Sequence, residues 1–131
     1  MQQGPRVVVI GLDCGTPKLL FDDLHAEVPT IAKLMSEGMY GDLASITPPI
    51  TVPAWACGLT GTTPGQLGLY GFRNRKDTTY EGLAIAHSGS IKKPAVWDAL
   101  GAQGKRSVLI GVPPSFPPPP EFPGWRVGCF L

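Results

Sequence analysis

The stretch 46–61 constrains the fold most, because a proline cluster there stands directly before an apolar segment. Pro48 and Pro49 have a fixed φ and no backbone N–H, so the chain at this point is extended or turning. The apolar residues 52–59 then favour a helix, and Gly61 is a typical helix end. The chain is therefore expected to enter a helix abruptly from an extended segment.

Thr51 stands where the proline cluster meets the predicted helix. It is the natural N-cap, and Pro53 then falls in the first turn, where a missing N–H costs little. A hydroxyl at a helix N-terminus lies beside N–H groups without helical partners and at the positive end of the helix dipole. Such a place suits an anion, phosphate above all. Threonine caps are common, so a purely structural role for Thr51 stays open.

Composition excludes several classes of protein. With 131 residues, a single domain is expected, and a net charge of +1 favours neither a nucleic-acid polymer nor a membrane surface as partner. The three cysteines are widely spaced and form no Cys-x-x-Cys pair, which fits a reducing compartment. No run is long enough to span a bilayer, and residues 1–6 lead directly into a strand without the shape of a signal peptide. We therefore expect a cytoplasmic protein. Its oligomeric state is not readable from the sequence.

Residues 6–12 open the fold as a β-branched run, typical of a strand buried on both faces of a parallel sheet. Asp13 follows directly. Ligands of open α/β sheets gather at the carboxyl ends of strands, so this carboxylate is well placed to hold a metal ion. The alternative is that Asp13 caps the following turn or helix. The glycines nearby do not form a dinucleotide fingerprint.

The rest of the chain is predicted to alternate between helices and strands. The expected elements are helices at 17–24, 29–37 and 93–100, strands at 40–46, 106–112 and 125–131, an ordered loop at 62–72 and a polyproline II connector at 113–120. For the polar run 73–77 a solvated bend is favoured over the alternative of part of an anion site. The side chains expected to face inward are Ile31, Leu34, Met35, Val96, Trp97 and Leu100. We expect strands 6–12 and 106–112 to lie parallel in one sheet, in an α/β fold that is mostly parallel with helices on both faces.

Three motifs, at 9–16, 47–55 and 59–65, resemble the N-terminal part of the type I phosphodiesterase/nucleotide pyrophosphatase family of the alkaline phosphatase superfamily. Their order and content carry the resemblance, which runs nearly the whole length of the chain. Cys14-Gly15 and Gln66-Leu67-Gly68 depart from patterns common in that family, and these departures affect substrate details more than the reaction class.

The resemblance implies an alkaline phosphatase-like fold and metal-dependent hydrolysis of small-molecule phosphoesters, of the phosphodiester or nucleotide pyrophosphate type. It implies that Thr51 is the nucleophile and a metal ligand, and that Asp13 binds one of two divalent ions, usually zinc. A phospho-threonine intermediate would form and then be hydrolysed. Asn74 corresponds loosely to an asparagine that binds a phosphate oxygen.

Two zinc ions need roughly seven or eight protein donors. The family supplies the remaining donors as Asp and His residues further along the chain; the two histidines here, His25 and His87, are not in family positions. We therefore expect residues 1–131 to be the N-terminal part of a longer hydrolase domain that is inactive alone. Two alternatives stay open. One is a non-catalytic phosphate- or nucleotide-binding α/β module, and the other is an interaction element built on the proline tract.

Overall fold

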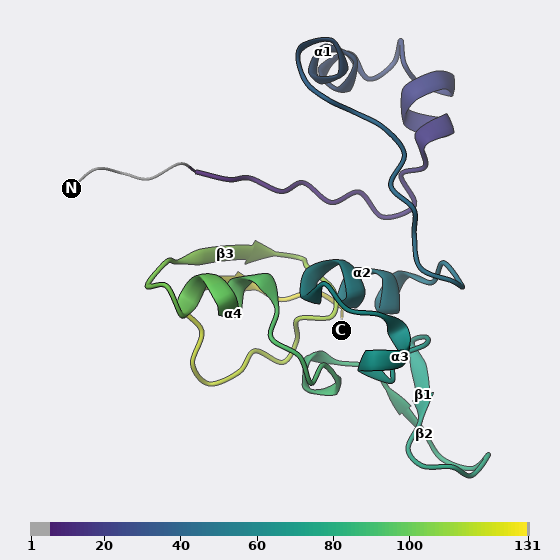
Figure 1. Ribbon diagram of the computed structural model, residues 1–131, viewed down its shortest axis with the longest axis vertical. Helices are drawn as coiled ribbons and strands as arrows, with labels where there is room; N and C mark the ends of the chain where they lie inside the picture. Colours follow the sequence, from purple (N-terminus) through teal and green to yellow (C-terminus); the bar gives the residue numbers. More distant parts are fainter. Residues whose placement is uncertain (1–5, 131) are drawn as a thin grey trace. The chain divides into compact units, whose positions relative to one another are not determined.

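The computed structural model describes residues 6–130. Residues 1–5, predicted to lead into the first strand, and Leu131, the last residue of the predicted strand 125–131, lie outside the described residues. The chain divides into two compact units, one ending at Ala44 and the other beginning at Ser45 (Figure 1).

Two helices form the regular structure of the first unit. A six-residue π-helix spans Lys18–Asp23, and α1 spans Pro29–Glu37, so both predicted helices are confirmed. Pro29 occupies the first turn of α1, and Gly38 ends the helix in an extended conformation, as predicted. The predicted inward face is wrong at Leu34, which is 62% exposed. None of the described residues of this unit is buried.

The two strands predicted in the first unit are absent. Residues 6–12 and 40–46 run without regular secondary structure, and the side chains of Val7 to Ile10 are each at least 80% exposed. A strand exists only through hydrogen bonds to a neighbouring strand, and no strand of the described structure pairs with either segment. β-Branched residues favour an extended backbone, but they do not supply that partner.

The second unit begins with α2 (Thr51–Thr60), which confirms the helix predicted at this place. Gly61 ends it in the left-handed conformation at φ 64°, and its N–H donates to the carbonyl oxygen of Cys57 over 2.8 Å. Glycine adopts this conformation without the steric cost that a Cβ would bring. α2 therefore ends at the glycine that the sequence predicts.

A short helix, α3 (Pro64–Leu67), replaces part of the loop predicted at 62–72. Thr63 caps it: its hydroxyl accepts from the backbone N–H of Gln66 (3.3 Å), and its own N–H donates to Oε1 of Gln66 (3.0 Å). This capping box sets the start of a single helical turn. The glycines on either side led us to expect no regular element here.

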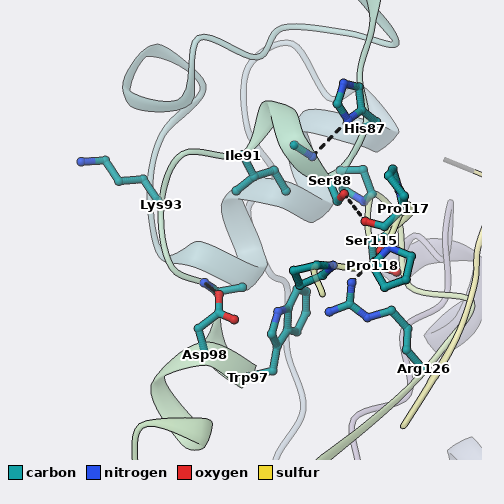
Figure 2. Close-up of a pocket in the computed structure, with 14 residues that line it drawn as sticks. His87, Ser88, Ile91, Lys93, Trp97, Asp98, Ser115, Pro117, Pro118 and Arg126 are labelled. Carbon is teal, nitrogen blue, oxygen red and sulfur yellow. Dashed lines mark hydrogen bonds between the residues drawn. The ribbon is translucent and has the colours of Figure 1, made fainter. Parts of the chain in front are cut away.

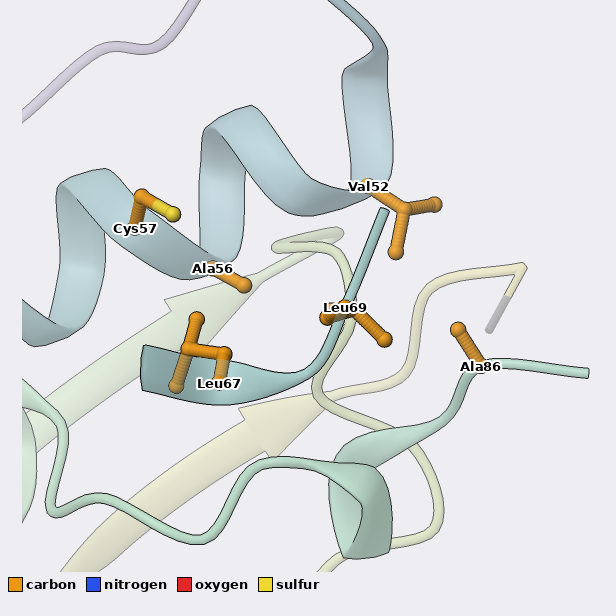
Figure 3. Packing of buried hydrophobic residues seen from close by; sticks show 6 residues of the cluster. All are labelled: Val52, Ala56, Cys57, Leu67, Leu69 and Ala86. Carbon is orange, nitrogen blue, oxygen red and sulfur yellow. The ribbon is translucent and has the colours of Figure 1, made fainter. Parts of the chain in front are cut away.

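α2 and α3 pack together around the main hydrophobic core, which Figure 3 shows from close by. The buried members of this cluster are Val52, Ala56, Cys57, Leu67, Leu69 and Ala86. Burial raises the pKa of the Cys57 thiol, so Cys57 packs here as a small neutral group. The core thus joins the first turn of α2 to the segment that follows α3.

A hairpin follows, formed by β1 (Arg73–Arg75) and β2 (Leu83–Ile85) in antiparallel register with Asn74 opposite Ala84. The bend predicted at 73–77 is therefore wrong for its first three residues. Asp77 shapes the connecting turn, because its Oδ1 accepts from the hydroxyl of Thr79 (2.6 Å) and from its backbone N–H (2.8 Å).

A 3₁₀ turn at Ser88–Ser90 leads to α4 (Val96–Gly101), which begins later than predicted. Ala95 holds the N-cap position in an extended conformation, and its N–H donates to Oδ2 of Asp98 over 2.7 Å. Trp97 is buried as predicted, whereas the first residue of the helix is half exposed. Among residues 6–130, no helix combines the length and the apolar composition that a bilayer crossing requires.

The last two strands, β3 (Ser107–Ile110) and β4 (Gly124–Val127), pair in parallel. β3 lies within the strand predicted at 106–112, and β4 begins one residue before the strand predicted at 125–131 and ends inside it. β3 was expected to lie beside residues 6–12, but its parallel partner in the described structure is β4. Within residues 6–130 the fold is therefore mixed α/β, with one antiparallel and one parallel strand pair and no mostly parallel sheet.

The proline-rich segment 111–123 is the crossover between the two parallel strands. It bends at several places instead of forming the regular polyproline II connector predicted at 113–120. Pro114 and Ser115 are fully buried, and the carbonyl oxygen of Ser115 accepts from Nη1 of Arg126 in β4 over 2.6 Å. The segment is fixed to the sheet by these contacts.

Gly124 pairs with Ser107 at the start of the two parallel strands. A Cβ built on Gly124 would lie 1.8 Å from the carbonyl oxygen of Ser107, and the backbone φ is 152°. We expect Gly124→Ala to destabilise the β3–β4 pair by about 1–3 kcal/mol, because the strands must separate to admit the methyl group. Amide hydrogen exchange of Val108 and Leu109 measures this.

The matched control is Gly58→Ala. Gly58 lies in α2, where a Cβ would have nothing within 4 Å, and alanine in a helix is more stable than glycine by roughly 0.5–1 kcal/mol. Unchanged exchange of the strand amides in Gly124→Ala would contradict the close approach described here.

Two hydrogen bonds from Thr79 hold the pKa of Asp77 below its usual value of 3.8. The bond from the side chain has the larger effect, and the bond from the backbone N–H adds to it. Because the carboxylate form is favoured in the folded turn, its stabilisation is present above the unfolded pKa and is lost as the pH falls through the folded pKa. We expect Thr79→Val to raise the titration midpoint of Asp77, measured by NMR.

Thr78→Val is the control, since no hydrogen bond of the described structure joins its hydroxyl to Asp77. An equal rise of the Asp77 midpoint in both variants would contradict the assignment to Thr79.

Candidate active site

Thr51 is the first residue of α2, half-buried at the start of the helix. The N-cap is Ile50, with φ −111° and ψ 135°, so the prediction that Thr51 is the N-cap is wrong. The proline cluster explains the shift: Ile50 stays extended after Pro49, and its carbonyl oxygen accepts the first helical bond, from Ala54 over 3.0 Å. The hydroxyl therefore lies one position inside the helix.

The first three residues of α2 donate no backbone hydrogen bond within the helix. The helix supplies no carbonyl acceptor for the N–H groups of Thr51 and Val52, and Pro53 has no N–H. No acidic side chain stands in this first turn. The Thr51 hydroxyl therefore lies at the positive end of a ten-residue helix dipole, a setting that favours an anion.

Asp13 lies in the first unit, in the turn that follows the extended residues 6–12. Its side chain is exposed, and its Oδ2 accepts from the thiol of Cys14 over 3.8 Å. Cys14 has φ 58°, a left-handed conformation that is uncommon for a residue with a Cβ. The hydroxyl of Thr16 accepts from the N–H of Leu19 (3.3 Å), and the N-cap position of the following π-helix is held by Pro17.

Asn74 lies in the middle of β1, and its side-chain amide holds the turn before the hairpin. Oδ1 accepts from the N–H of Tyr70 over 2.8 Å, and Nδ2 donates to the carbonyl oxygen of Gly71 over 2.9 Å. One N–H of the amide is used in this way, and a primary amide carries two. Asn74 thus has a structural role together with one further N–H donor.

A pocket of about 520 Å³ lies beside this turn, and we call it the hairpin pocket. It is lined by Gly68, Tyr70, Arg73, Asn74, Arg75 and Leu83. Two of these six residues are cationic and none is acidic. The predicted phosphate-binding residue Asn74 therefore stands in positively charged surroundings.

A second pocket, of about 420 Å³, lies between the 3₁₀ turn, the start of α4, the proline segment and β4 (Figure 2). Its polar groups serve the fold: Nδ1 of His87 accepts from the N–H of Gly89 (3.1 Å), and the hydroxyl of Ser88 donates to the carbonyl oxygen of Pro117 over 2.5 Å. The Arg126 guanidinium lies over the rings of Phe122 (4.3 Å) and Trp97 (5.7 Å). These contacts give the polar side chains of the second pocket a structural role, and none of them marks a reacting group.

Burial lowers the pKa of the Arg126 guanidinium, and the nearby charges of Asp98 and Cys129 act in the opposite direction. An arginine remains protonated in proteins even so. Arg126 is therefore a half-buried cation held by aromatic rings and by one backbone carbonyl.

Sequence reasoning missed the arginine of the second pocket. Arg126 stands within a predicted apolar strand, where a charged residue is a recognisable signal. Arg73 and Arg75 stand in a polar run for which the sequence favours a solvated bend over the alternative of part of an anion site. Their pocket depends on the pairing of β1 with β2, which links residues about ten positions apart.

The metal donors do not gather within one part of the described chain. Among residues 6–130, no group of three or more His, Cys, Asp and Glu side chains lies close enough to hold a metal ion. His25 lies exposed in a turn after the π-helix, and His87 caps the 3₁₀ turn. The residues described here thus do not by themselves form a complete site for a divalent ion.

Comparison with known proteins gives one match. The sequence model of the type I phosphodiesterase/nucleotide pyrophosphatase family matches residues 7–126, which includes Asp13, Thr51 and Asn74. No curated protein and no solved structure matches the chain. Since the family match covers most of the sequence, the chain belongs to the type I phosphodiesterase/nucleotide pyrophosphatase family.

Proposed function

We propose that this protein hydrolyses small-molecule phosphoesters, of the phosphodiester or nucleotide pyrophosphate type, with Thr51 as the nucleophile. The observation that carries the proposal is the position of Thr51 in the first turn of α2, inside a family match that spans residues 7–126. The positive end of the helix would attract a phosphoryl group toward the hydroxyl.

The proposed first step transfers the phosphoryl group to the protein. The Thr51 oxygen forms a bond to phosphorus as the bond to the leaving oxygen breaks, and water then breaks the phospho-threonine bond. The positive end of the α2 dipole would stabilise the negative charge of the phosphoryl oxygens. Asn74 is proposed to donate its second amide N–H to one of these oxygens.

A threonine hydroxyl is a weak nucleophile at neutral pH and must be activated. The family is generally metal-dependent. We propose that two divalent ions, zinc by resemblance, serve this protein and that Asp13 and Thr51 are among their donors. A bound ion would lower the pKa of the hydroxyl and reduce the repulsion between the nucleophile and the phosphoryl group.

Two donors do not complete a two-metal site, which needs roughly three or four protein donors for each ion. We therefore propose that further donors come from a longer form of the protein, and that the 131-residue chain alone hydrolyses phosphoesters negligibly. The alternative of a non-catalytic phosphate-binding module predicts phosphate binding without turnover in that longer form.

We expect Thr51→Ala to reduce turnover of a p-nitrophenyl phosphodiester in such a longer form by roughly a thousandfold or more, because the attacking oxygen is lost. Thr51→Ser should keep part of the activity, since serine retains the hydroxyl. The fold should be unaffected, because Ile50 and not Thr51 holds the cap position. Phosphoryl trapping on Thr51, read by mass spectrometry, tests the intermediate directly.

Thr60→Ala is the matched control. Thr60 ends the same helix, and its hydroxyl donates to the carbonyl oxygen of Ala56 over 2.7 Å. This variant should keep turnover within a few-fold of the unmodified protein. If Thr51→Ala hydrolyses substrate at the unmodified rate in saturating zinc, the proposed nucleophile is wrong.

For Asp13→Asn we expect the zinc concentration for half-maximal activity to rise by about tenfold or more, because a neutral amide replaces an anionic donor. Titration of activity with zinc measures this change. Asp42→Asn, which changes another exposed carboxylate of the first unit, should leave the titration unchanged. Superimposable zinc titrations for Asp13→Asn and the unmodified protein would remove Asp13 from the proposed donors.

A further inference from the structure

The second pocket combines apolar walls with one carboxylate and two cationic side chains. Its larger apolar side chains belong to Ile91, Trp97, Pro114, Pro117, Pro118 and Pro119. Its charged side chains belong to Lys93, Asp98 and Arg126, and Figure 2 shows the ammonium of Lys93 pointing away from the residues around Trp97. The volume of about 420 Å³ is near the lower end of the usual range for ligand sites, so a fitting ligand is small.

Hydrogen bonds hold the proline wall of this pocket in place. The N–H of Ser88 donates to the carbonyl oxygen of Phe116 over 3.0 Å, and the Ser88 hydroxyl donates to the carbonyl oxygen of Pro117. Pro114, on the same wall, is fully buried. Proline has a fixed φ, so a wall of prolines has little conformational freedom to lose when a ligand binds.

Arg126 has hydrogen-bond donors beyond those that the fold uses. A guanidinium carries five N–H groups, and within residues 6–130 the acceptor of Arg126 is the carbonyl oxygen of Ser115, 2.6 Å from Nη1. Of the two nitrogens without an acceptor in these residues, Nε is buried and Nη2 is not. The rings of Trp97 and Phe122 lie against the group. Nη2 can therefore donate to an anionic group of a ligand.

Asp98 places a negative charge near this cation without pairing with it. Its Oδ2 accepts from the N–H of Ala95 over 2.7 Å, and neither ion pair of residues 6–130 lies in the second unit. Burial has the larger effect on the pKa of Arg126 and lowers it, while the charge of Asp98 acts in the opposite direction, so the two charges interact. This carboxylate repels a dianion such as phosphate, whereas a ligand with one positive and one negative group is attracted to both residues.

We propose that the second pocket binds a free α-amino acid with an apolar side chain. The carboxylate of the amino acid accepts from Nη2 of Arg126, and its ammonium group donates to the carboxylate of Asp98. Its side chain lies against the prolines and the ring of Trp97, where the burial of apolar surface adds to the affinity. Such a ligand supplies a partner for each charge, and its binding requires neither Thr51 nor a metal ion.

NMR titration of the 131-residue chain with L-leucine, at constant pH and ionic strength, tests the proposal. We expect saturable shifts of the indole N–H signal of Trp97, which Trp97→Phe identifies by its loss. Two analogues of leucine each lack one charge: 4-methylpentanoate has no ammonium group, and 3-methylbutylamine has no carboxylate. Each should bind about tenfold more weakly or worse, because one charge-assisted hydrogen bond is lost. Glycine, which has no apolar side chain, should also bind more weakly.

Asp98→Asn tests the contact with the ammonium group. The amide oxygen of asparagine can still accept from the N–H of Ala95, so the start of α4 keeps its hydrogen bond. We expect this variant to bind leucine about tenfold more weakly or worse, whereas 4-methylpentanoate, which has no ammonium group, should lose no affinity. Retained amide shifts of β3 and β4 would establish that the variant is folded.

The matched control is Glu121→Gln, which removes an exposed carboxylate of the second unit outside the pocket lining. It should bind leucine within about twofold of the unmodified chain, because attraction between exposed charges is weak. Substitution of Arg126 would also remove its bond to Ser115, so the contact with the ligand carboxylate is tested with 3-methylbutylamine and the unmodified chain.

Four results would overturn the inference: no saturable shift of the Trp97 signal with leucine, equal affinity for leucine and any of the three comparison ligands, unchanged leucine binding in Asp98→Asn, or an equal loss in Glu121→Gln. If Asp98→Asn did not fold, the comparison of ligands with the unmodified chain would still decide.

Discussion

The second unit depends on the packing of one face of α2 against the chain that follows it. Val52 and Ala56 are four residues apart, which places them on the same face of the helix, and neither has any exposed surface. The chain can return to this face because Gly61 reverses it in the left-handed conformation and Thr63 starts a new helical turn at once. Leu67 and Leu69 then complete the core. Both the position of Thr51 and the base of the hairpin follow from this arrangement.

Elements with local causes were predictable from the sequence. Proline at the start and glycine at the end identified α1, and the apolar run before Gly61 identified α2. Elements that depend on distant partners were not. The run Val7 to Ile10 has strand-forming residues but no pairing strand in the described structure, whereas β1 has polar residues and forms a strand because β2 pairs with it. Side-chain type predicts an extended backbone, but pairing is decided by tertiary contacts.

The candidate site shows the same division. Thr51 was identifiable because a hydroxyl follows a proline cluster and precedes an apolar run, a local pattern, although its place relative to the cap differed by one residue. Its proposed chemistry, and that of Asp13 and Asn74, comes from resemblance to a family. The structural role of Asn74, which fixes the turn at Tyr70 and Gly71, needed the folded backbone to become apparent. The two arginines beside it become a pocket wall only once the hairpin has formed.

The exposed run Val7 to Ile10 has a consequence for the behaviour of the chain in solution. Four consecutive β-branched side chains without charge, proline or glycine have the composition of segments that assemble as stacked strands between identical molecules. Globular proteins protect such segments by covering them or by interrupting them with charged residues. Here the nearest charged residues are Arg6, directly before the run, and Asp13, three residues after it. Charged residues that flank an apolar strand-forming run oppose its stacking between molecules, so the carboxylate proposed as a metal donor also stands where a charge has this effect.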